Sequence, residues 1–186
     1  GGRQVGGDFL KMFSFPLVAG NVETALETPN AIVLTKEMAI CLFGHENWSD
    51  MLGQVVRVDN FYDQKVTGVL ENVPDNSSLS FNYLLPFSMW ENMDWVKDAR
   101  SSWENNSFQM FMELQPGVDG AAFAGKIKDL IRRNNKESKA YVTLHALADW
   151  RLRGEFEHGK VAGGYIEYVR LFGIIGIFVL LIACVN

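Results

Sequence analysis

The sequence predicts a mixed fold of the α/β (α+β) class, with helices packed on mixed sheets and an apolar helix starting at the C-terminal end. Strand-like and helix-like stretches follow the order β-α-β-β-β and then β-α-β, which favours helices on one face of the sheet. Clusters of Asn, Asp and Ser separate these stretches as turns. The chain has 186 residues, of which 48% are hydrophobic and 21% charged, as expected of a globular protein.

The first element is a short amphipathic stretch rich in phenylalanine, GDFLKMFSFPLVAG (7–20). Phe9, Phe13 and Phe15 are its core candidates, and a proline and a glycine interrupt it. We therefore expect a short element that contributes aromatic side chains to the core.

A strand followed by a helix is expected next. NAIVLT (30–35) is a strand by its Ile-Val-Leu run, and Thr35 caps the helix KEMAICLFG. Glu37 lies in the first turn of this helix, and Gly44 ends it. Its predicted apolar face consists of Met38, Ala39, Leu42 and Phe43.

A hairpin is predicted for GQVVRVDNFYDQKVTGVLENVP (53–74). Valines alternate with Arg57 in its first arm, Asp59 and Asn60 make the turn, and residues 66–70 return as the second arm. Alternation and a two-residue Asp-Asn turn are both typical of an antiparallel pair.

The remaining stretches are predicted from local pattern. FNYLLPF (81–87) is a strand, and residues 88–105 form a helical turn and a loop that carry three tryptophans. SFQMFMEL (107–114) alternates strictly, which predicts a strand, and AYVTLHAL (140–147) is another. ADWRLRGEFEHGKVAGG (148–164) is polar with several glycines, which indicates a linker.

The clearest amphipathic helix is predicted for PGVDGAAFAGKIKDLIRRNNKES (116–138). Its apolar positions recur at i, i+4, i+7 and i+8, and they are Phe123, Ile127, Leu130 and Ile131. Cationic side chains suit the negative C-terminal end of a helix, and here they are Lys128, Arg132 and Arg133.

The charge and the cysteines restrict the function. The net charge is −5, and no cationic cluster exceeds the pair Arg132 and Arg133, so we expect no nucleic-acid partner. Cys41 and Cys184 are the only cysteines. We expect both to be buried as small apolar side chains, and they do not indicate a compartment.

No constellation of residues predicts catalysis. His45, His145 and His158 are scattered and have no second ligand at metal-binding spacing, so no metal site is expected. We expect His145 to lie at the surface or hydrogen-bonded in the core. There is no phosphate-binding glycine loop and no nucleophile elbow. We therefore expect no catalytic residue and no cofactor, and the chain is not expected to be an enzyme.

The terminal run 171–185 has no charged residue and no polar face. As a helix it would span about 22 Å, whereas a bilayer core of about 30 Å needs about 20 residues. We favour a truncated membrane span; a buried core helix and a signal-type or artificial segment are the alternatives. The candidate membrane residues are Leu171, Phe172, Ile174, Ile175, Ile177, Phe178, Val179, Leu180, Leu181, Ile182 and Val185.

A series of these motifs resembles one known family over nearly the whole chain. In order they are GGDFLKMFSFPLVAGN, AIVLTKEMAICLFG, GQVVRV, VTGVLENVPDNSSLSF, NNSFQMFMEL and the ending YIEYVRLFGIIGIFVLLIACVN. The series is similar to the periplasmic domain of MacB-like, FtsX-related ABC transporter permeases of the Bacteroidetes type. The ending resembles the start of the second transmembrane helix of that family.

The resemblance implies a non-enzymatic permease subunit of the bacterial inner membrane, with this domain on the periplasmic side. Its implied partners are the membrane, a second permease in a homodimer or heterodimer, a separate cytoplasmic ABC ATPase and a periplasmic adaptor protein. It implies that ATP-driven movement is coupled mechanically to export of antimicrobial peptides, macrolides or lipoproteins. The alternative is a membrane-anchored extracytoplasmic sensor or ligand-binding domain.

The resemblance also implies a division of the chain. Residues 1–164 would be a partial periplasmic domain that lacks its N-terminal part, and residues 165–186 the start of a truncated transmembrane helix. The chain begins with Gly rather than Met, so we expect a piece of a longer protein. Aromatic side chains can anchor interfaces, and the candidates for a partner surface are Trp48, Trp90, Trp95 and Trp103. At least two of these four are expected in the core instead.

Overall fold

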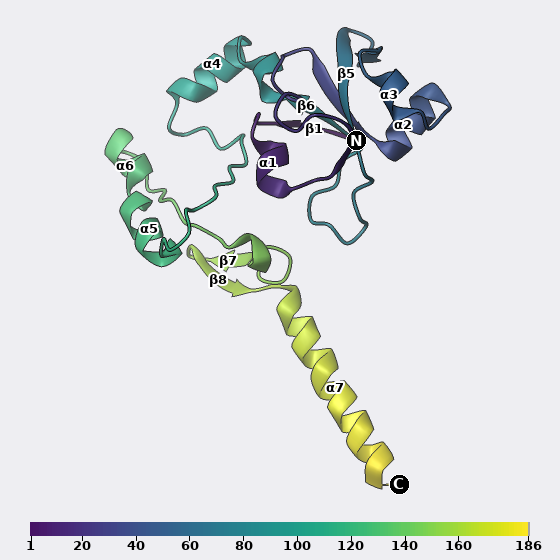
Figure 1. Ribbon diagram of the computed structural model, residues 1–186. Coiled ribbons are helices and arrows are strands. Elements are labelled where there is room, and N and C mark those ends of the chain that lie inside the picture. The colour runs from purple at the N-terminus through teal and green to yellow at the C-terminus, as the bar shows by residue number, and fades with distance from the viewer. Residues whose placement is uncertain (186) are drawn as a thin grey trace. The chain divides into compact units, whose positions relative to one another are not determined.

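The computed structural model describes residues 1–185 and consists of two compact units, Gly1–Glu113 and Leu114–Asn186 (Figure 1). The mixture of strands and helices confirms the predicted α+β class. Each unit has its own sheet: six strands in the first unit and a two-stranded hairpin in the second.

The sheet of the first unit has the strand order β1-β6-β3-β5-β2, with β4 also paired to β5. The pairs β1 with β6 and β3 with β5 are parallel, whereas β3 with β6, β2 with β5 and β4 with β5 are antiparallel. The strand bounds are β1 Gly2–Val5, β2 Leu17–Gly20, β3 Ala31–Thr35, β4 Val55–Val58, β5 Tyr62–Leu70 and β6 Tyr83–Pro86. The strands predicted at 30–35 and 81–87 are therefore confirmed.

The first unit also contains short helices. They are α1 Phe9–Phe13, α2 Lys36–Phe43, α3 Trp48–Met51, the 3-10 turn η1 Phe87–Trp90 and α4 Asp94–Ser101. Of the three core candidates, Phe9 and Phe15 are half-buried against the first core cluster, with ring centroids 5.8 Å apart, and Phe15 lies 5.1 Å from Phe81. Phe13 is half-buried outside that cluster, and Leu10 is the buried residue of α1.

Both faces of the large sheet are buried. Val33 packs in one cluster with Leu10 of α1, and its neighbour Leu34 packs in a second cluster with Ala39 of α2 and Met51 of α3. The expectation of helices on one face is therefore wrong. Successive side chains of a strand point to opposite faces, so the unbroken apolar strand β3 needs a cover on each side.

Helix α2 begins and ends as predicted. The Thr35 hydroxyl accepts a hydrogen bond from the amide of Met38, and Gly44 ends the helix with φ of 75°. Three of the four residues of its predicted apolar face, Met38, Ala39 and Phe43, pack in the second core cluster. The fourth, Leu42, is exposed, so the prediction is wrong at this position. Cys41 is also exposed, contrary to expectation. It lies two residues after buried Ala39, which places it on the opposite side of the helix.

The β4–β5 hairpin confirms the predicted turn. Asp59 and Asn60 have left-handed φ angles of 52° and 57°, and the Phe61 amide closes the turn on the Val58 carbonyl at 3.1 Å. Val58 pairs with Tyr62, so three residues connect the two strands. Across the ladder Arg57 lies opposite Asp63 and donates two hydrogen bonds to its carboxylate, at 2.6 and 2.9 Å. The hydrogen bonds and the charge of Arg57 lower the pKa of Asp63 below its ordinary value.

Residues 107–114 do not form the predicted strand and follow an irregular path. Strict alternation shows only that one side of an extended segment is apolar, and a strand also needs a hydrogen-bonded neighbour. Met110, one of the alternating apolar residues of this segment, is 81% exposed.

In the second unit the predicted long helix is two short ones. Helix α5 covers Gly120–Ile127 and α6 covers Leu130–Asn134, with a turn at Lys128 and Asp129 between them. Its expected apolar face is buried nowhere, and Leu130 is exposed. Without a surface to pack on, tertiary contacts do not enforce a continuous helix.

The strand predicted at 140–147 is also absent, and a 3-10 turn, η2 Leu147–Asp149, follows it. In this stretch the amide of Val142 donates a hydrogen bond to the carbonyl of Lys128, at 2.9 Å. A helix end, rather than a strand, is therefore its neighbour.

The predicted linker 148–164 contains a hairpin. Strand β7, Glu155–Glu157, pairs antiparallel with β8, Lys160–Gly163. His158 and Gly159 form its turn with φ angles of 49° and 75°. Gly159, one of the glycines that indicated a linker, instead provides the left-handed conformation of this turn.

Candidate membrane segment and aromatic surface

The second unit ends in one long helix, α7, Tyr165–Val185. Its 21 residues span about 31 Å, and its most apolar 18-residue window has a mean hydropathy of 2.5. By length and composition this helix can cross a membrane. It is six residues longer than the uncharged run on which the prediction was based.

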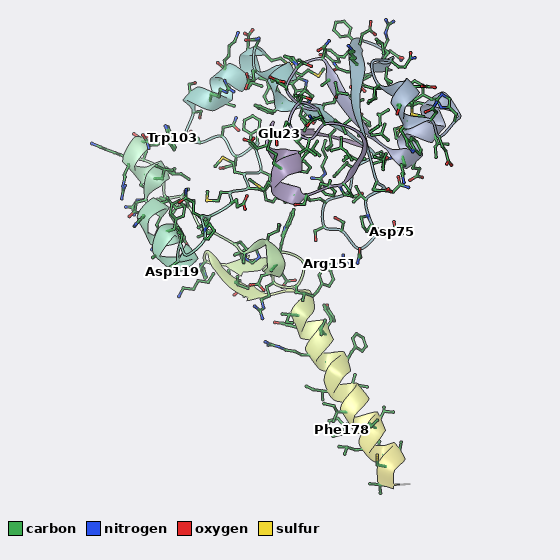
Figure 2. All side chains as sticks on the ribbon, in the orientation of Figure 1. Glu23, Asp75, Trp103, Asp119, Arg151 and Phe178 are labelled. Atoms are coloured by element: carbon green, nitrogen blue, oxygen red, sulfur yellow. The ribbon has the colours of Figure 1, made fainter. Side chains whose placement is uncertain are left out.

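Every candidate membrane residue of α7 is exposed, and side chains extend from it on all sides, as Figure 2 shows around Phe178. No described residue of the helix is buried, so nothing in the structure favours the core-helix alternative. Cys184 is exposed with the rest of the helix, which makes the expectation of burial wrong.

The first turns of α7 differ from the remainder. Tyr165 and Tyr168 lie with ring centroids 6.4 Å apart, and Glu167 and Arg170 are the charged residues of the helix. Tyrosines are enriched where a membrane helix meets the lipid headgroups, and arginine near a helix end can extend its guanidinium to water. The composition therefore changes along the helix as it does at a membrane boundary.

The start of α7 is held by the segment before it. The amide of Ile166 donates to the carbonyl of Leu152 at 2.9 Å, and the amide of Glu167 donates to Gly164 at 3.1 Å. Gly164 is the single residue between β8 and α7. The hairpin and the helix are therefore joined without a flexible connection.

An aromatic surface in the first unit combines residues from three segments: Phe87, Trp90, Trp95 and Phe108. The ring centroids of Trp90 and Trp95 are 5.6 Å apart, those of Trp95 and Phe108 are 6.0 Å apart, and those of Phe87 and Phe108 are 5.2 Å apart. Trp95 is 43% exposed, whereas the indole nitrogen of Trp90 is buried with no partner among the described residues. The surface is a connected series of rings with one edge open to solvent.

The four predicted tryptophans do not form one site. Trp48 packs beside the second core cluster, and the Lys36 ammonium lies 5.9 Å from its ring centroid. Trp103 is 44% exposed, and Trp48 and Trp90 are half-buried. Sequence reasoning missed Phe87 and Phe108, which complete the aromatic surface; no local spacing links them to Trp95.

The histidines remain apart from any ligand cluster. Among residues 1–185 no group of three or more His, Cys, Asp or Glu side chains could hold a metal ion. The ring of His145 packs 5.0 Å from that of Phe156, and its Nε2 is buried with no hydrogen-bond partner in the described part of the chain. His145 is thus half-buried, and its Nε2 makes no hydrogen bond among the described residues.

Comparison with protein families matches residues 1–130 to the MacB-like periplasmic core domain. A comparison with curated proteins found no match. Among solved structures the chain is similar to a domain of a permease protein from Porphyromonas gingivalis, with 22% identity and a TM-score of 0.50, covering 72% of this chain and 54% of that one. The chain thus spans about half the length of that structure, and the likeness concerns the fold.

Two further solved structures are similar. The periplasmic region of MacB from Actinobacillus actinomycetemcomitans has 14% identity and a TM-score of 0.46, covering 71% of this chain and 55% of that one. The extracellular domain of the noncanonic ABC-type transporter YknZ from Gram-positive bacteria has 19% identity and a TM-score of 0.49, covering 77% and 69%.

Proposed function

This chain belongs to the family of MacB-like periplasmic core domains, and from that premise we propose that it is the periplasmic domain of an ABC transporter permease subunit in the bacterial inner membrane. The observation that carries the proposal is α7, an exposed apolar helix of membrane-spanning length in the same chain as the family domain. The proposed division is a periplasmic part, 1–164, followed by a membrane helix from residue 165.

The energetics of α7 support its place in lipid. Eleven of the fifteen residues in 171–185 are Leu, Ile, Phe or Val, and each favours insertion by roughly 0.3–0.6 kcal/mol at mid-helix. Together they favour insertion by about 3–6 kcal/mol. Tyr165, Tyr168 and Arg170 would then lie at the level of the headgroups.

The proposed role of the domain is mechanical. A permease dimer would bind a cytoplasmic ABC ATPase and a periplasmic adaptor protein, and ATP hydrolysis would occur on the ATPase alone. The rigid junction at Gly164 suits a helix that transmits displacement to the β7–β8 hairpin. The exported substrate would be an antimicrobial peptide, a macrolide or a lipoprotein.

The two native cysteines allow a direct test of topology. Cys41 and Cys184 both have free thiols, so both should react with maleimides once the protein is denatured in SDS. In intact cells a membrane-impermeant maleimide should label Cys41 in the Cys184→Ser variant. The same reagent should leave Cys184 unlabelled in the Cys41→Ser variant, because lipid covers it.

Each variant is the matched control of the other, and both should label fully after denaturation in SDS. Equal labelling of Cys184 in intact cells and after denaturation would show that α7 is not in lipid. Labelling of Cys41 only in permeabilised cells would place the domain in the cytoplasm and contradict the proposal.

Mechanical coupling has its own test. A flexible Gly-Ser-Gly-Ser insertion after Gly164 should abolish export by the permease–ATPase complex while ATP hydrolysis continues. The same insertion after Asn76, in an exposed turn of the first unit, is the control and should leave export intact. Unchanged export with the insertion at Gly164 would contradict mechanical transmission through this junction, whereas absence of export by the unaltered complex would favour the sensor or ligand-binding alternative.

A further inference from the structure

The second unit contains a hollow of about 330 Å³. Three segments form it: helix α5, the extended stretch 141–144 and the turn of the β7–β8 hairpin. Its lining consists of Ala124, Gly125, Lys128, Tyr141, Val142, Thr143, Leu144, His158, Gly159 and Lys160.

Specific contacts hold the three segments together. The Tyr141 hydroxyl donates to the carbonyl of His158 at 2.7 Å, which ties the stretch to the hairpin turn. The Lys128 ammonium lies 5.6 Å from the Tyr141 ring centroid, and the Lys128 carbonyl accepts from the amide of Val142 at 2.9 Å. The hollow is therefore formed by contacts between segments distant in sequence.

The charge lining the hollow has one sign. Lys128 and Lys160 contribute ammonium groups, His158 an imidazole, and no carboxylate lines it. In the part of the chain that the structure describes, neither lysine forms an ion pair. A second hollow in this unit differs, because its lining includes Asp129, which lies 3.7 Å from Arg132.

The whole second unit adds to this potential. It contains ten Lys and Arg against seven Asp and Glu, a net charge of +3, within a chain of net charge −5. A cationic hollow in a cationic unit attracts anions before they make contact.

We propose that this hollow binds a phosphate-bearing anion. Two ammonium groups can share the phosphate charge, and the Thr143 hydroxyl and the imidazole of His158 offer further hydrogen-bond donors. Ala124, Val142 and Leu144 give an apolar side for the carbon part of the ligand. The volume lies at the lower end of small-ligand sites, about 300–1,000 Å³. The phosphate is that of an anionic lipid headgroup or of a free phosphate, and the test distinguishes them.

The test measures binding to the chain in uncharged detergent micelles by isothermal titration calorimetry. The probes are inorganic phosphate, short-chain phosphatidylglycerol and short-chain phosphatidylcholine. The paired substitutions Lys128→Gln and Lys160→Gln should weaken binding of the anionic probe at least tenfold. The matched control, Lys126→Gln with Lys139→Gln, removes the same charge outside the hollow and should change affinity less than twofold.

Each outcome decides the proposal. Binding of phosphatidylglycerol without binding of inorganic phosphate assigns the lipid headgroup, and comparable binding of both assigns the phosphate group alone. Equal weakening by the two variant pairs would reduce the effect to general charge and overturn the proposal. Equal affinity for phosphatidylcholine, or no binding of either anionic probe at millimolar concentration, would also overturn it. Circular dichroism of both variants checks that all four exposed substitutions leave the fold unchanged.

Discussion

The two units of this chain are held together in different ways. The buried apolar side chains described in the structure all lie in Gly1–Glu113, and in Leu114–Asn186 only Gly163 and Gly164 are buried among the described residues. The first unit carries a net charge of −8, and the second carries +3. The first unit is stabilised by a core, and the second by hydrogen bonds and ring contacts at its surface.

This difference predicts which substitutions should lower the stability of the whole unit and which should have only local effects. Burial of apolar surface is the dominant favourable term in folding, and a unit without it depends on individual polar contacts. Substitutions of similar type should therefore have global effects in the first unit and local effects in the second. The predictions below compare matched positions in the two units.

The largest expected difference is between two leucines. Leu34 of β3 is fully buried, so Leu34→Ala should lower the free energy of unfolding by about 2–5 kcal/mol. Leu147 is 51% exposed, and Leu147→Ala should change the free energy of unfolding by less than about 0.5 kcal/mol. Urea denaturation followed by tryptophan fluorescence in detergent measures both. Similar losses from the two substitutions would show that the second unit also has a core.

A pair of glycines with positive φ gives the next comparison. Gly20 has φ of 98°, and a Cβ there would lie 2.5 Å from the Thr67 carbonyl oxygen of β5. Gly159 has φ of 75°, and a Cβ there would collide with the Tyr141 phenol. Backbone in a sheet cannot move aside, whereas a tyrosine side chain can rotate.

We therefore expect Gly20→Ala to destabilise the first unit by more than about 1 kcal/mol, because strain and the clash add. Gly159→Ala should leave the unfolding of the first unit unchanged and increase hydrogen exchange only in the hairpin and residues 141–144. Hydrogen exchange with mass spectrometry measures both effects. Destabilisation of the first unit by Gly159→Ala would contradict the expectation that substitutions in the second unit have only local effects.

Helix caps provide a smaller comparison. The Thr35 hydroxyl caps α2, and the Asp119 carboxylate accepts from the amide of Ala121 at 2.9 Å to cap α5. Loss of such a cap costs about 1 kcal/mol. Thr35→Ala should shift the urea midpoint of the whole first unit, whereas Asp119→Ala should only fray α5. A shift of the same midpoint by Asp119→Ala would contradict this.

The same difference explains which elements the sequence could predict. The strand and helix on either side of Thr35 and the hairpin turn at Asp59 and Asn60 follow from residues close in sequence, and all were predicted. The alternation in 107–114 has no such local consequence, because a strand is defined by a partner that the alternation does not specify. The His158 and Gly159 turn was a usable hairpin signal that the surrounding polar residues obscured.

The candidate site shows the same limit. The apolar run of α7 was predicted from composition, whereas its first six residues, which include the charged Glu167 and Arg170, were assigned to the helix only through the family resemblance. The contact between Trp95 and Phe108 depends on how the irregular segment after α4 folds back onto that helix. No spacing of residues in the sequence predicts this path.

The smallest expected effect concerns the Arg57–Asp63 ion pair, whose residues lie opposite each other in the β4–β5 ladder. The ion pairs of the second unit instead join residues three or four positions apart in sequence. Because the pKa of Asp63 is lowered in the folded protein, the pair stabilises the hairpin above about pH 4, near the unfolded carboxyl pKa, and this contribution is lost as the pH falls through the folded pKa. NMR titration should give Asp63 a pKa below 3.8 that rises in Arg57→Gln. Arg100→Gln, which removes the partner of Glu91, is the control and should leave the pKa of Asp63 unchanged. An unaltered Asp63 titration in Arg57→Gln would mean that solvent, rather than the strand register, sets the charge of this exposed pair.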